Sequence, residues 1–513
     1  MTKLRERFLP KALISVTDKT GAVELAHTLI NNGYDVLSTG GTGRLLKENG
    51  IPVLEIAQYT GSPEMFGGRV KTLHPRVFGG ILGRPDLDEK EFQSHALEPI
   101  SIVVVNLYQF SKTIRETNTT RAQAIEEIDI GGVSLIRAAA KNQEHVLVIV
   151  DPNDYHNVSE RISAGQVDAA FRESMAAKAF RHTAAYDAEI ARYLSSNEKF
   201  PERLTLTYER DAVMRYGENP HQDAAYYRDP SRHREIDQLQ GKAMSYNNIA
   251  DTDAALQCLS GLTESACVIV KHANPCGIAI GNSLLDAYTK AFRTDPTSAF
   301  GGIVAFNQEL DATTLEHVLD NQFAEVIAAP SVDESVPSIA KRKKALRLLT
   351  VSNDRSSANS LSVNSVGNGA LVQDLDTADL SDAEWSVLTE RAPSMDEERD
   401  LRFAWHVVKH VKSNAIVFVH DRMTIGIGAG QPNRVISVRI ASLRMKEEDL
   451  GKSGCVMASD AFFPFRDGID YAAEAGVTAI IQPAGSIRDD EVITACNDHG
   501  MAMVATGIRH FRH

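Results

Sequence analysis

The chain has 513 residues, a formal net charge of -14 and 43% hydrophobic residues. A chain of this length is too long for one ordinary hydrophobic core, so we expect two to four globular domains. The acidic balance argues against a general nucleic-acid or membrane binder, whose surface would be basic. A few local Lys and Arg side chains can still form a pocket for an anion on an acidic body. We therefore expect small-molecule substrates, with neither nucleic acid nor membrane as a partner.

The cysteines indicate a reducing compartment. They stand at positions 258, 267, 276, 455 and 496, and they form neither a C-x-x-C pair nor a plausible disulfide framework. Residues 1–7 are charged and lack the apolar core of a signal peptide, and no run of about 18 apolar residues occurs. We predict a cytoplasmic protein without a metal site.

The first two hundred residues alternate between strands and helices. Residues 12–16 form an apolar β-former run, apolar positions at helical spacing follow Gly21, and short strands are expected at 35–37 and 53–56. This βαβαβ order predicts a parallel, doubly wound sheet. Later expected elements are a strand at 101–107, a helix at 133–140, a strand at 145–150 and a helix at 171–194. The polar residues 195–197 mark a boundary between predicted domains 1–196 and 200–513.

The turn Ser38-Thr39-Gly40-Gly41-Thr42-Gly43 is a candidate anion site. A Ser/Thr/Gly-rich bend that leads into a helix offers free N–H groups and hydroxyls, and the helix dipole adds to them. It is not a dinucleotide fingerprint, because Leu46 stands where the third glycine of G-x-G-x-x-G is needed. A single phosphate is the better interpretation, and a plain Gly-rich turn is the alternative.

Cations and polar groups follow this turn along the chain. In the extended segment 67–75, Arg69 and Lys71 project to one side and suit a phosphate or an oxyanion; solvated charges are the alternative. Tyr108 follows the strand at 101–107, and Asp129 precedes a Gly-Gly turn and the helix that closes on Lys141. Asp129 could be only an N-cap, and Lys141 only a helix-end cation.

The run Lys271-His272-Ala273-Asn274-Pro275-Cys276-Gly277 is the strongest candidate for chemistry. It follows the apolar strand at 266–270, and Pro275 and Gly277 argue against regular structure, so we predict a loop at the end of a buried strand. An imidazole suits proton transfer near neutral pH, and a neighbouring ammonium can stabilise negative charge. The alternative is that His272 only makes a hydrogen bond within a turn.

The remaining chain shows several further polar loops. Residues 214–222 are dense in groups that bind anions or stack on rings, residues 242–248 are expected as polar loop, and a helix is expected at 251–262. Residues 296–302 precede a strand at 303–306, and the basic residues 341–344 are interpreted as a solvated face. Lys412-Ser413-Asn414 before a strand weakly repeats the pattern at 271–281, which suggests two related subdomains.

Two loops near the C-terminus complete the candidates. Residues 428–434 form a Gly-rich bend before a helix, which suits an anion or a ring. Residues 459–467 place aromatic rings beside charges, as a pterin-like ring requires, and a core aromatic cluster is the alternative.

Together these motifs closely resemble the bifunctional purine biosynthesis family, nearly end to end. The resemblance rests on Ser-Thr-Gly-Gly-Thr at 38–42, residues 69–75, 129–132, 215–222, 271–277 and 460–467. It implies an N-terminal domain like methylglyoxal synthase that acts as inosine monophosphate (IMP) cyclohydrolase. It implies a C-terminal pair of cytidine deaminase-like α/β subdomains that act as aminoimidazole carboxamide ribonucleotide (AICAR) formyltransferase. Formyl would pass from the co-substrate 10-formyltetrahydrofolate to the AICAR amine, and formyl-AICAR would then close its ring.

The resemblance also implies roles for individual residues. His272 would be the base, Lys271 would assist protonation or stabilise charge, and Asn414 would orient the formyl group. The cyclohydrolase positions would be Lys71, Tyr108, Asp129 and Lys141, with Lys141 or Lys71 favoured for proton transfer. The substrate-binding residues would be Ser15, Lys19, Ser38, Thr39, Gly40, Thr42, Arg69, Thr72 and Asn106 in the first domain, and Arg215, Tyr216, Gly301, Arg434, Phe462, Asp467 and Arg509 in the second.

Two other readings remain open from the sequence. The N-terminal domain could only sense a nucleotide phosphate, but Tyr108, Asp129 and Lys141 argue against this. A zinc-dependent deaminase would need H-x-E and P-C-x-x-C, whereas Asn274 and Ala279 occupy the positions of the glutamate and the second cysteine. The family resemblance further implies a homodimer with sites at its interface.

Overall fold

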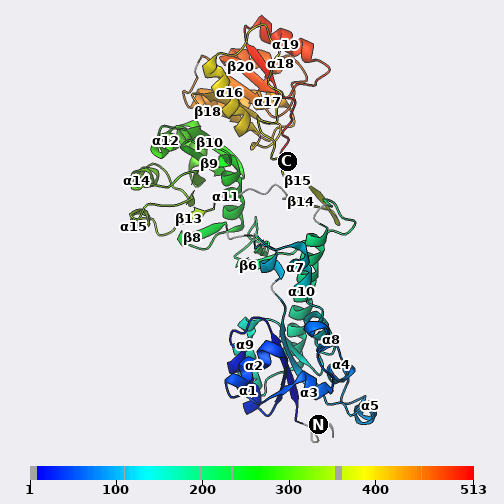
Figure 1. Ribbon diagram of the computed structural model, residues 1–513. Coiled ribbons are helices and arrows are strands. Elements are labelled where there is room, and N and C mark those ends of the chain that lie inside the picture. Colours follow the sequence, from blue (N-terminus) through cyan, green and yellow to red (C-terminus); the bar gives the residue numbers. More distant parts are fainter. Residues whose placement is uncertain are drawn as a thin grey trace. The chain divides into compact units, whose positions relative to one another are not determined.

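The computed structural model describes residues 9–108, 110–116, 118–195, 198–230, 232, 235–352, 361–451 and 453–513 (Figure 1). The charged residues 1–7 and the predicted boundary residues 196–197 lie outside the described residues. The chain divides into two compact units, Met1–Tyr208 with Asp229–Ser231 and Glu209–Arg228 with Arg232–His513. In the described residues, no helix combines the length and the apolar character needed to cross a membrane.

Unit 1 is built on a five-stranded parallel sheet with the order β3-β2-β1-β4-β5, which confirms the predicted doubly wound topology. Its strands are β1 (Lys11–Val16), β2 (Asp35–Ser38), β3 (Val53–Glu55), β4 (Ile100–Asn106) and β5 (Leu147–Ile149). Its helices are α1 (Ala22–Asn31), α2 (Gly40–Glu48), α3 (Ile56–Thr60), η1 (Phe66–Gly68), α4 (Pro75–Leu82), α5 (Glu89–Ser94), α6 (Phe110–Thr113), α7 (Arg121–Glu126), α8 (Gly131–Lys141), η2 (Pro152–Asp154), α9 (Tyr155–Ser163) and α10 (Ala169–Leu194).

Helices cover both faces of this sheet, and this explains the near-continuous apolar strands (Figure 1). Val103 and Val105 of β4 pack in a core with α4, α8 and α10. Ile102 and Val104, which point to the other face, pack in a second core with α1 and α9. The carboxyl ends of β1, β2 and β4 therefore lie at one edge of the sheet, where the polar turns of unit 1 follow the strands.

Unit 2 contains a twelve-stranded sheet with the order β16-β21-β20-β19-β17-β18-β10-β9-β11-β12-β13-β8 and two separate hairpins. Its strands are β6 (Glu209–Met214), β7 (Ala224–Arg228), β8 (Ile236–Gln240), β9 (Ala266–Lys271), β10 (Asn274–Ile280), β11 (Ile303–Phe306), β12 (Val326–Ala329), β13 (Arg347–Val351), β14 (Leu361–Val366), β15 (Gly369–Asp374), β16 (Ser386–Val387), β17 (Ile416–His420), β18 (Met423–Gly428), β19 (Cys455–Ser459), β20 (Val477–Gln482) and β21 (Ala502–Ala505). Its helices are α11 (Tyr246–Leu259), α12 (Leu284–Thr294), α13 (Pro296–Ala299), α14 (Ala312–Asn321), α15 (Val336–Ala340), α16 (Met395–Val408), α17 (Arg434–Glu447), α18 (Asp467–Glu474) and α19 (Asp489–Asp498).

The large sheet is an internal repeat. In the first half β9 is antiparallel to both β10 and β11, β11, β12 and β13 are mutually parallel, and β8 closes the edge antiparallel to β13. In the second half β17, β18, β19, β20, β21 and β16 pair in the same directions and the same order. The halves join where β10 meets β18, with Ala279 opposite Met423. This repeat is the pair of related α/β subdomains that the fold prediction contains.

Two local predictions in unit 2 are wrong. Residues 271–277 are not an irregular loop, because β9 and β10 form a tight hairpin that turns at His272 and Ala273. Pro275 is tolerated because β10 has a bulge between Pro275 and Gly277 and pairs with β18 only farther along the strand. Residues 246–248 are not loop either, since α11 begins at Tyr246 with a capping box between Ser245 and Asn248.

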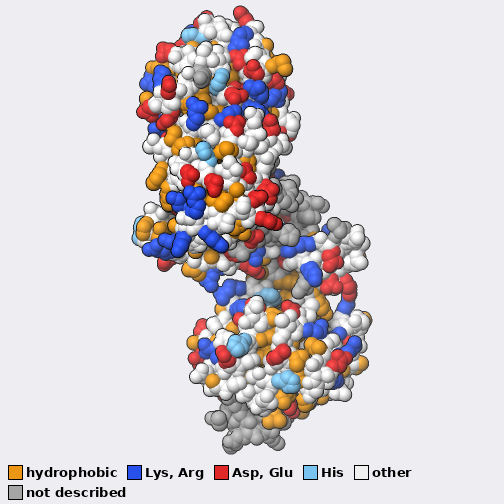
Figure 2. All heavy atoms as spheres, turned by 90° about the vertical axis from the view of Figure 1, so that its left-hand side faces the viewer, with side chains coloured by type: hydrophobic (Ala, Val, Ile, Leu, Met, Phe, Trp, Pro, Cys, Tyr) orange, Lys and Arg blue, Asp and Glu red, His pale blue; other side chains and the backbone are white. Residues whose placement is uncertain are grey.

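Charge is distributed in small groups over the surface. On the face drawn in Figure 2, acidic and basic side chains are intermixed, and groups of either sign are small. Such local groups can favour an anion even though the whole chain carries a net charge of -14.

Candidate functional site

The first group of predicted residues lies at the carboxyl edge of the sheet in unit 1. The Ser15 hydroxyl is 3.1 Å from that of Thr39, so the end of β1 meets the turn after β2 there. An added Cβ on Gly41 would lie 3.9 Å from Lys19 Nζ, and one on Gly40 would lie 3.5 Å from Lys71 Nζ. Two ammonium groups thus flank the N-terminus of α2, where free N–H groups and the helix dipole favour an anion.

Other members of the predicted set shape this turn. The Ser38 hydroxyl donates to Ile14 O at 2.7 Å, and Thr42 Oγ1 both accepts from Val16 N and donates to Val16 O. Asn106 at the end of β4 accepts from Thr17 N at 2.6 Å and Asp18 N at 3.0 Å. These three buried side chains make their hydrogen bonds within the protein, so they position the turn rather than offer free donors to a ligand.

The second group surrounds Asp129 at the start of α8. The Asp129 carboxylate accepts from Gly132 N at 2.6 Å, and an added Cβ on Gly132 would lie 2.5 Å from it. Thr72 Oγ1 would lie 3.1 Å from a Cβ on Gly131, so the Gly-Gly pair lets the start of α8 approach both side chains. Tyr108 is half exposed nearby and its backbone hydrogen-bonds to Asp129. Lys71, Thr72, Tyr108 and Asp129 therefore belong to one edge of the sheet.

Electrostatics distinguishes the groups of this edge. Burial raises the pKa of Asp129, and the backbone N–H groups of Gly132 and Tyr108 only partly oppose this. Burial also raises the pKa of Tyr108, with Asp129 and Glu127 adding to the effect. Lys71 Nζ lies 3.4 Å from Glu64, and Arg69 forms an ion pair with Glu126. Lys71 is thus half-exposed and, among the described residues, paired with the Glu64 carboxylate alone, so an anionic ligand can compete with Glu64 for its ammonium.

Lys141 is not brought to this edge within one chain. It is the last residue of α8 and stands ten positions after Gly131, which is about 15 Å along the helix. Asn142, the next residue, donates to Ile81 O and Gly83 O at the far end of α4. Lys141 is exposed at the opposite edge of the sheet from Asp129.

In unit 2 the central candidate, His272, lies at the tip of the β9–β10 hairpin. His272 and Ala273 have φ angles of 55° and 56°, the two left-handed residues that a type I′ turn requires. Glycine or asparagine is usual there, since a left-handed backbone costs other residues roughly 1–2 kcal/mol each. Asp251 of α11 accepts from His272 N at 3.2 Å and from Ala273 N at 2.7 Å. Hydrogen bonds to a charged group contribute about 1.5–3 kcal/mol each, so this carboxylate offsets the cost of the turn.

The hairpin tip is connected with its surroundings on both sides. Lys271 Nζ donates to Phe300 O at 2.9 Å, which places the loop of Gly301 beside the tip. The exposed rings of Phe300 and Phe323 pack against each other at 5.6 Å. Asn274 donates to His272 O at 3.3 Å and accepts from Lys412 N at 3.0 Å, so the segment before β17 in the second half reaches the same place.

The residues after Lys412 form a buried polar network. The Asn414 amide donates to Gln431 O and Pro432 O, and its oxygen accepts from Arg434 at 2.8 Å. The Arg434 guanidinium also donates to Ser459 at 2.8 Å and forms an ion pair with Asp460, which is fully buried. Asn414 and Arg434 therefore help to hold the loop between β18 and α17.

The predicted ring-binding residues and the C-terminal segment adjoin this network. His510 N donates to Asp460 O, and Ser413 N donates to Arg512 O. Phe462 remains 38% exposed, Phe463 is buried and Arg488 covers the Phe465 ring. Asp467, the first residue of α18, accepts from Gly468 N at 2.9 Å, and Arg509 stacks on Phe511 at 4.3 Å.

Arg215 and Tyr216 lie apart from the hairpin tip in the described contacts. They follow β6, with the Arg215 guanidinium 5.6 Å from the centre of the Tyr216 ring. Asn247 of α11 donates to Glu218 O at 3.4 Å and so connects this loop with the first half of the sheet. Among the described residues, no hydrogen bond or ion pair joins Arg215 or Tyr216 to His272.

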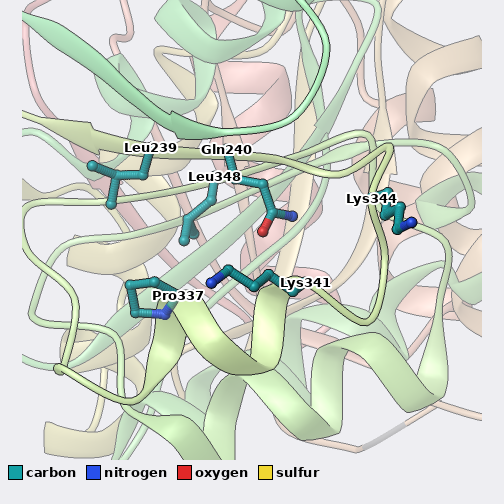
Figure 3. A pocket seen from close by; sticks show the side chains of 6 residues that line it. All are labelled: Leu239, Gln240, Pro337, Lys341, Lys344 and Leu348. Atoms are coloured by element: carbon teal, nitrogen blue, oxygen red, sulfur yellow. The ribbon is translucent and has the colours of Figure 1, made fainter.

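A cavity of about 350 Å³ lies at the other end of the first half, lined by Leu239, Gln240, Pro337, Lys341, Lys344 and Leu348 (Figure 3). It is bounded by β8, β13 and α15. Because β13 is three strands away from β9 in the sheet, the cavity lies about 14 Å or more from β9. Gln240 donates to Ala340 O at 2.9 Å. The basic residues 341–344 are exposed as predicted, but the pattern gave no sign that two of them line a cavity.

Sequence reasoning missed Asp251 as part of the candidate site, and it gave Asn274 and Asp460, which stand in the predicted motifs 271–277 and 459–467, no role of their own. One signal was available for Asp251, because it precedes His272 by 21 residues and Asp400 precedes Asp421 by the same 21 in the second half. The contacts of Asn274 with Lys412 and of Asp460 with Arg434 join distant segments, for which the sequence shows no local pattern. Among the described residues, no three His, Cys, Asp or Glu side chains gather as a metal site requires.

Comparisons with known proteins identify the family of the chain. Residues 139–444 match the family model of the AICARFT/IMPCHase bienzyme, and residues 21–134 match that of the MGS-like domain. A solved structure titled "Crystal structure of ForH" is 38% identical over 36% of this chain and 98% of that chain, with a TM-score of 0.33. Since the bienzyme model covers more than half of the 513 residues, the chain belongs to the AICARFT/IMPCHase bienzyme family and is a bifunctional AICAR formyltransferase and IMP cyclohydrolase with an MGS-like N-terminal domain.

Proposed function

We propose that the last two steps of IMP synthesis run at two separate sites, formyl transfer at the β9–β10 hairpin tip and ring closure at the carboxyl edge of the sheet in unit 1. The observation that carries this division is that each unit has its own cluster of proton-transfer and anion-binding groups. His272 and Lys271 belong to unit 2, whereas Lys71, Tyr108 and Asp129 belong to unit 1.

Formyl transfer needs a base because the AICAR amine is conjugated with its ring and is a poor nucleophile. The amine nitrogen attacks the formyl carbon of a folate-type donor, which we propose to be 10-formyltetrahydrofolate. His272 takes the amine proton, the bond from the formyl carbon to the folate nitrogen breaks, and that nitrogen gains a proton. Lys271, anchored on Phe300 O, stabilises the oxyanion or assists this protonation. Phe300 and Phe323 offer exposed ring faces beside the tip for a planar substrate.

The other predicted residues of unit 2 act by supporting this site. Asn414 and Arg434 orient the loop at 428–434, and we propose that Asn414 keeps the formyl group in place from there. Arg215, Tyr216, Gly301 and Arg509 are proposed to bind AICAR, and Phe462 and Asp467 to lie near the folate. Arg215 and Arg509 are both exposed, which supports this role.

Ring closure joins two groups of one molecule. The carboxamide nitrogen attacks the formyl carbon and water leaves, so the entropic cost is small and charge stabilisation dominates the barrier. Ser15, Lys19, Thr39, Gly40, Arg69 and Thr72 are proposed to hold the phosphate, in the turn that Ser38, Thr42 and Asn106 position. Lys71, whose ammonium lies near Gly40, is proposed to stabilise the oxyanion or transfer the proton.

We propose a homodimer in which Lys141 acts at the site of the second copy, because Lys141 stands about 15 Å along α8 from the Asp129 end of its own chain. The five cysteines are free thiols, which supports the proposal of a reducing, cytoplasmic location.

The pH dependence of ring closure tests whether the reaction needs Asp129 as an ionised carboxylate. Its pKa is raised by burial, so on acidification the carboxylate gains its proton at a pH above the ordinary 3.8. We expect the rate of IMP formation from supplied formyl-AICAR to fall on the acid side with a midpoint above 3.8, and Asp129→Asn to lower kcat by about 100-fold. Initial rates between about pH 4 and pH 8 measure both. An unchanged acid limb in the Asp129→Asn protein would assign the titration to another group.

The direct test supplies the pure protein with AICAR and 10-formyltetrahydrofolate and follows tetrahydrofolate and IMP separately. We expect both products to form. If tetrahydrofolate forms and IMP appears only at the uncatalysed rate, the N-terminal domain is a nucleotide sensor and the proposed second site is wrong. If neither forms, the proposed pair of reactions is wrong for this chain.

A further inference from the structure

The hairpin turn that carries His272 occurs twice in unit 2. The β17–β18 hairpin turns at Asp421 and Arg422, whose φ angles are 50° and 52°, close to the 55° and 56° of His272 and Ala273. None of the four residues is a glycine, although type I′ turns favour one. The same unusual turn therefore stands at equivalent places in the two halves of the repeat.

In both halves a carboxylate on a neighbouring helix accepts hydrogen bonds from the turn. Asp400 of α16 accepts from Asp421 N at 2.7 Å and from Arg422 N at 2.9 Å, as Asp251 of α11 does from His272 N and Ala273 N. In a two-residue hairpin these N–H groups point out of the strand ladder, so each needs an acceptor from elsewhere. One helix carboxylate supplies the acceptor for both N–H groups in each half.

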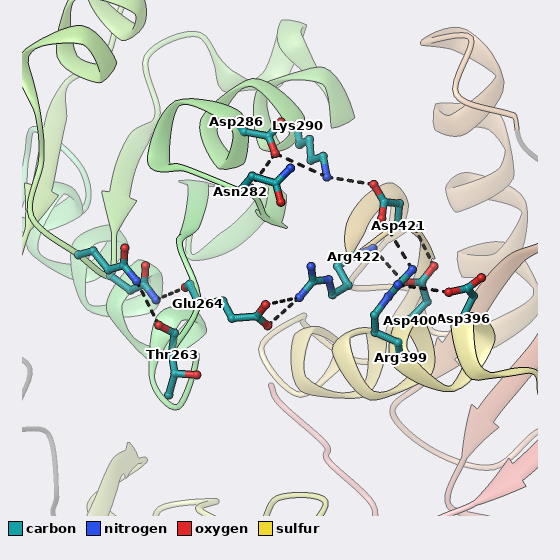
Figure 4. Close-up of polar contacts among 12 residues, drawn as sticks. Thr263, Glu264, Asn282, Asp286, Lys290, Asp396, Arg399, Asp400, Asp421 and Arg422 are labelled. Carbon is teal, nitrogen blue, oxygen red and sulfur yellow. Dashed lines mark hydrogen bonds and ion pairs between the residues drawn. The ribbon is translucent and has the colours of Figure 1, made fainter.

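The side chains at the two tips differ in what they do. Arg422 forms an ion pair with Glu264, and Asp421 forms one with Lys290, so the second tip ties the two halves together (Figure 4). The His272 imidazole is exposed, and among the described residues it has no hydrogen-bond or ion-pair partner. The first tip thus keeps the turn but leaves its side chain available to a substrate.

We infer that Asp251 is a positioning residue for formyl transfer, which holds the His272-Ala273 turn left-handed and so aims the imidazole at the AICAR amine. This rests on the proposed function of His272 as the base. An imidazole on an unsupported hairpin tip would sample other turns, and a displacement of about 1 Å at the reacting atoms can cost a factor of about 100 in rate. Asp251 acts on the backbone and touches no reacting atom.

Asp251→Asn tests this in the full-length protein. The amide places an N–H donor against one of the two turn N–H groups, so the turn loses at least one acceptor. We expect kcat of formyl transfer to fall by about 100-fold, with KM for AICAR within about twofold of wild type, because the loss is confined to the transition state. Ring closure of supplied formyl-AICAR, catalysed by unit 1, should be unchanged and confirms an intact protein.

Ala273→Gly supplies the sharpest check. Glycine adopts the left-handed turn without help, so Asp251→Asn/Ala273→Gly should regain at least about tenfold of the lost kcat. A double variant as slow as Asp251→Asn would overturn the inference, since the carboxylate would then act by some route other than the turn. A normal kcat in Asp251→Asn would overturn it as well.

Asp400→Asn is the matched control from the second half. It weakens the corresponding pair of hydrogen bonds at a tip whose two side chains are held in ion pairs, and we expect kcat within about twofold of wild type. An equal loss of kcat in Asp400→Asn and Asp251→Asn would show a general effect on the sheet and would refute positioning. The rescue by Ala273→Gly decides the question even if Asp400→Asn does not fold. His272→Ala distinguishes failure of the proposed function from failure of the positioning role. If His272→Ala keeps full formyl transfer, the proposed function of His272 is wrong. If His272→Ala is slow and Asp251→Asn is normal, only the positioning role of Asp251 is wrong.

Discussion

Replacing His272 with alanine is expected to lower kcat of formyl transfer by about 100-fold to 10,000-fold, the usual contribution of a positioned general base. The imidazole is exposed at the tip of the β9–β10 hairpin, and Lys271 beside it is anchored on Phe300 O. Alanine keeps the backbone bonds to Asp251, so the fold of the hairpin should persist. Tetrahydrofolate release from AICAR and 10-formyltetrahydrofolate measures the loss.

The matched control is the second reaction of the same protein. The His272→Ala protein should still convert supplied formyl-AICAR to IMP at the wild-type rate, because ring closure is assigned to unit 1. Loss of both activities together would contradict two separate sites. Normal formyl transfer would remove His272 from the mechanism.

Replacing Lys71 with alanine is expected to lower kcat of ring closure by about 100-fold to 1,000-fold, the cost of removing one donor that stabilises an oxyanion. Its ammonium lies near Gly40 at the start of α2 and 3.4 Å from Glu64, at the same edge of the sheet as Asp129. IMP formation from supplied formyl-AICAR is the measurement, and formyl transfer should be unchanged. A rate within about twofold of wild type would exclude Lys71 as the charge-stabilising group.

Lys141→Ala tests the proposed exchange between two copies. If Lys141 acts in the partner's site, Lys141→Ala alone should slow ring closure, and a mixture with Lys71→Ala should recover activity. One site of each mixed dimer then holds both lysines. A slow Lys141→Ala protein without recovery on mixing would contradict the exchange, and a fast one would exclude Lys141 from the reaction.

Local patterns sufficed for regular elements and for the family. The apolar residues of β4 predicted a buried strand because both of its faces are covered by helices. The motifs at 38–42, 69–75 and 271–277 carried the resemblance that the family comparison confirms. Even the equal spacing from Asp251 to His272 and from Asp400 to Asp421 was present in the sequence, although its meaning was not apparent.

Local sequence patterns were insufficient where contacts with other segments decide the structure or the hydrogen-bond partner. Pro275 and Gly277 argued for a loop, yet the bulge in β10 and the late start of its pairing with β18 let the strand continue. The sequence also could not predict that the Ser38 and Thr42 hydroxyls donate to Ile14 O and Val16 O of β1. A hydroxyl has the same chemistry in both roles, so only the contact decides between them.

The sequence by itself determined the alternation of strands and helices and the family. Both depend on residue type and on spacing along the chain, because these set the local preference for helix or strand and the chemistry of each motif. The tertiary structure alone decided which side chains remain free for substrate, which is why His272 is open while Arg434 is held by Asp460. It also decided that Lys141 stands at the far end of α8 from Asp129, because a helix converts a separation of ten residues into about 15 Å.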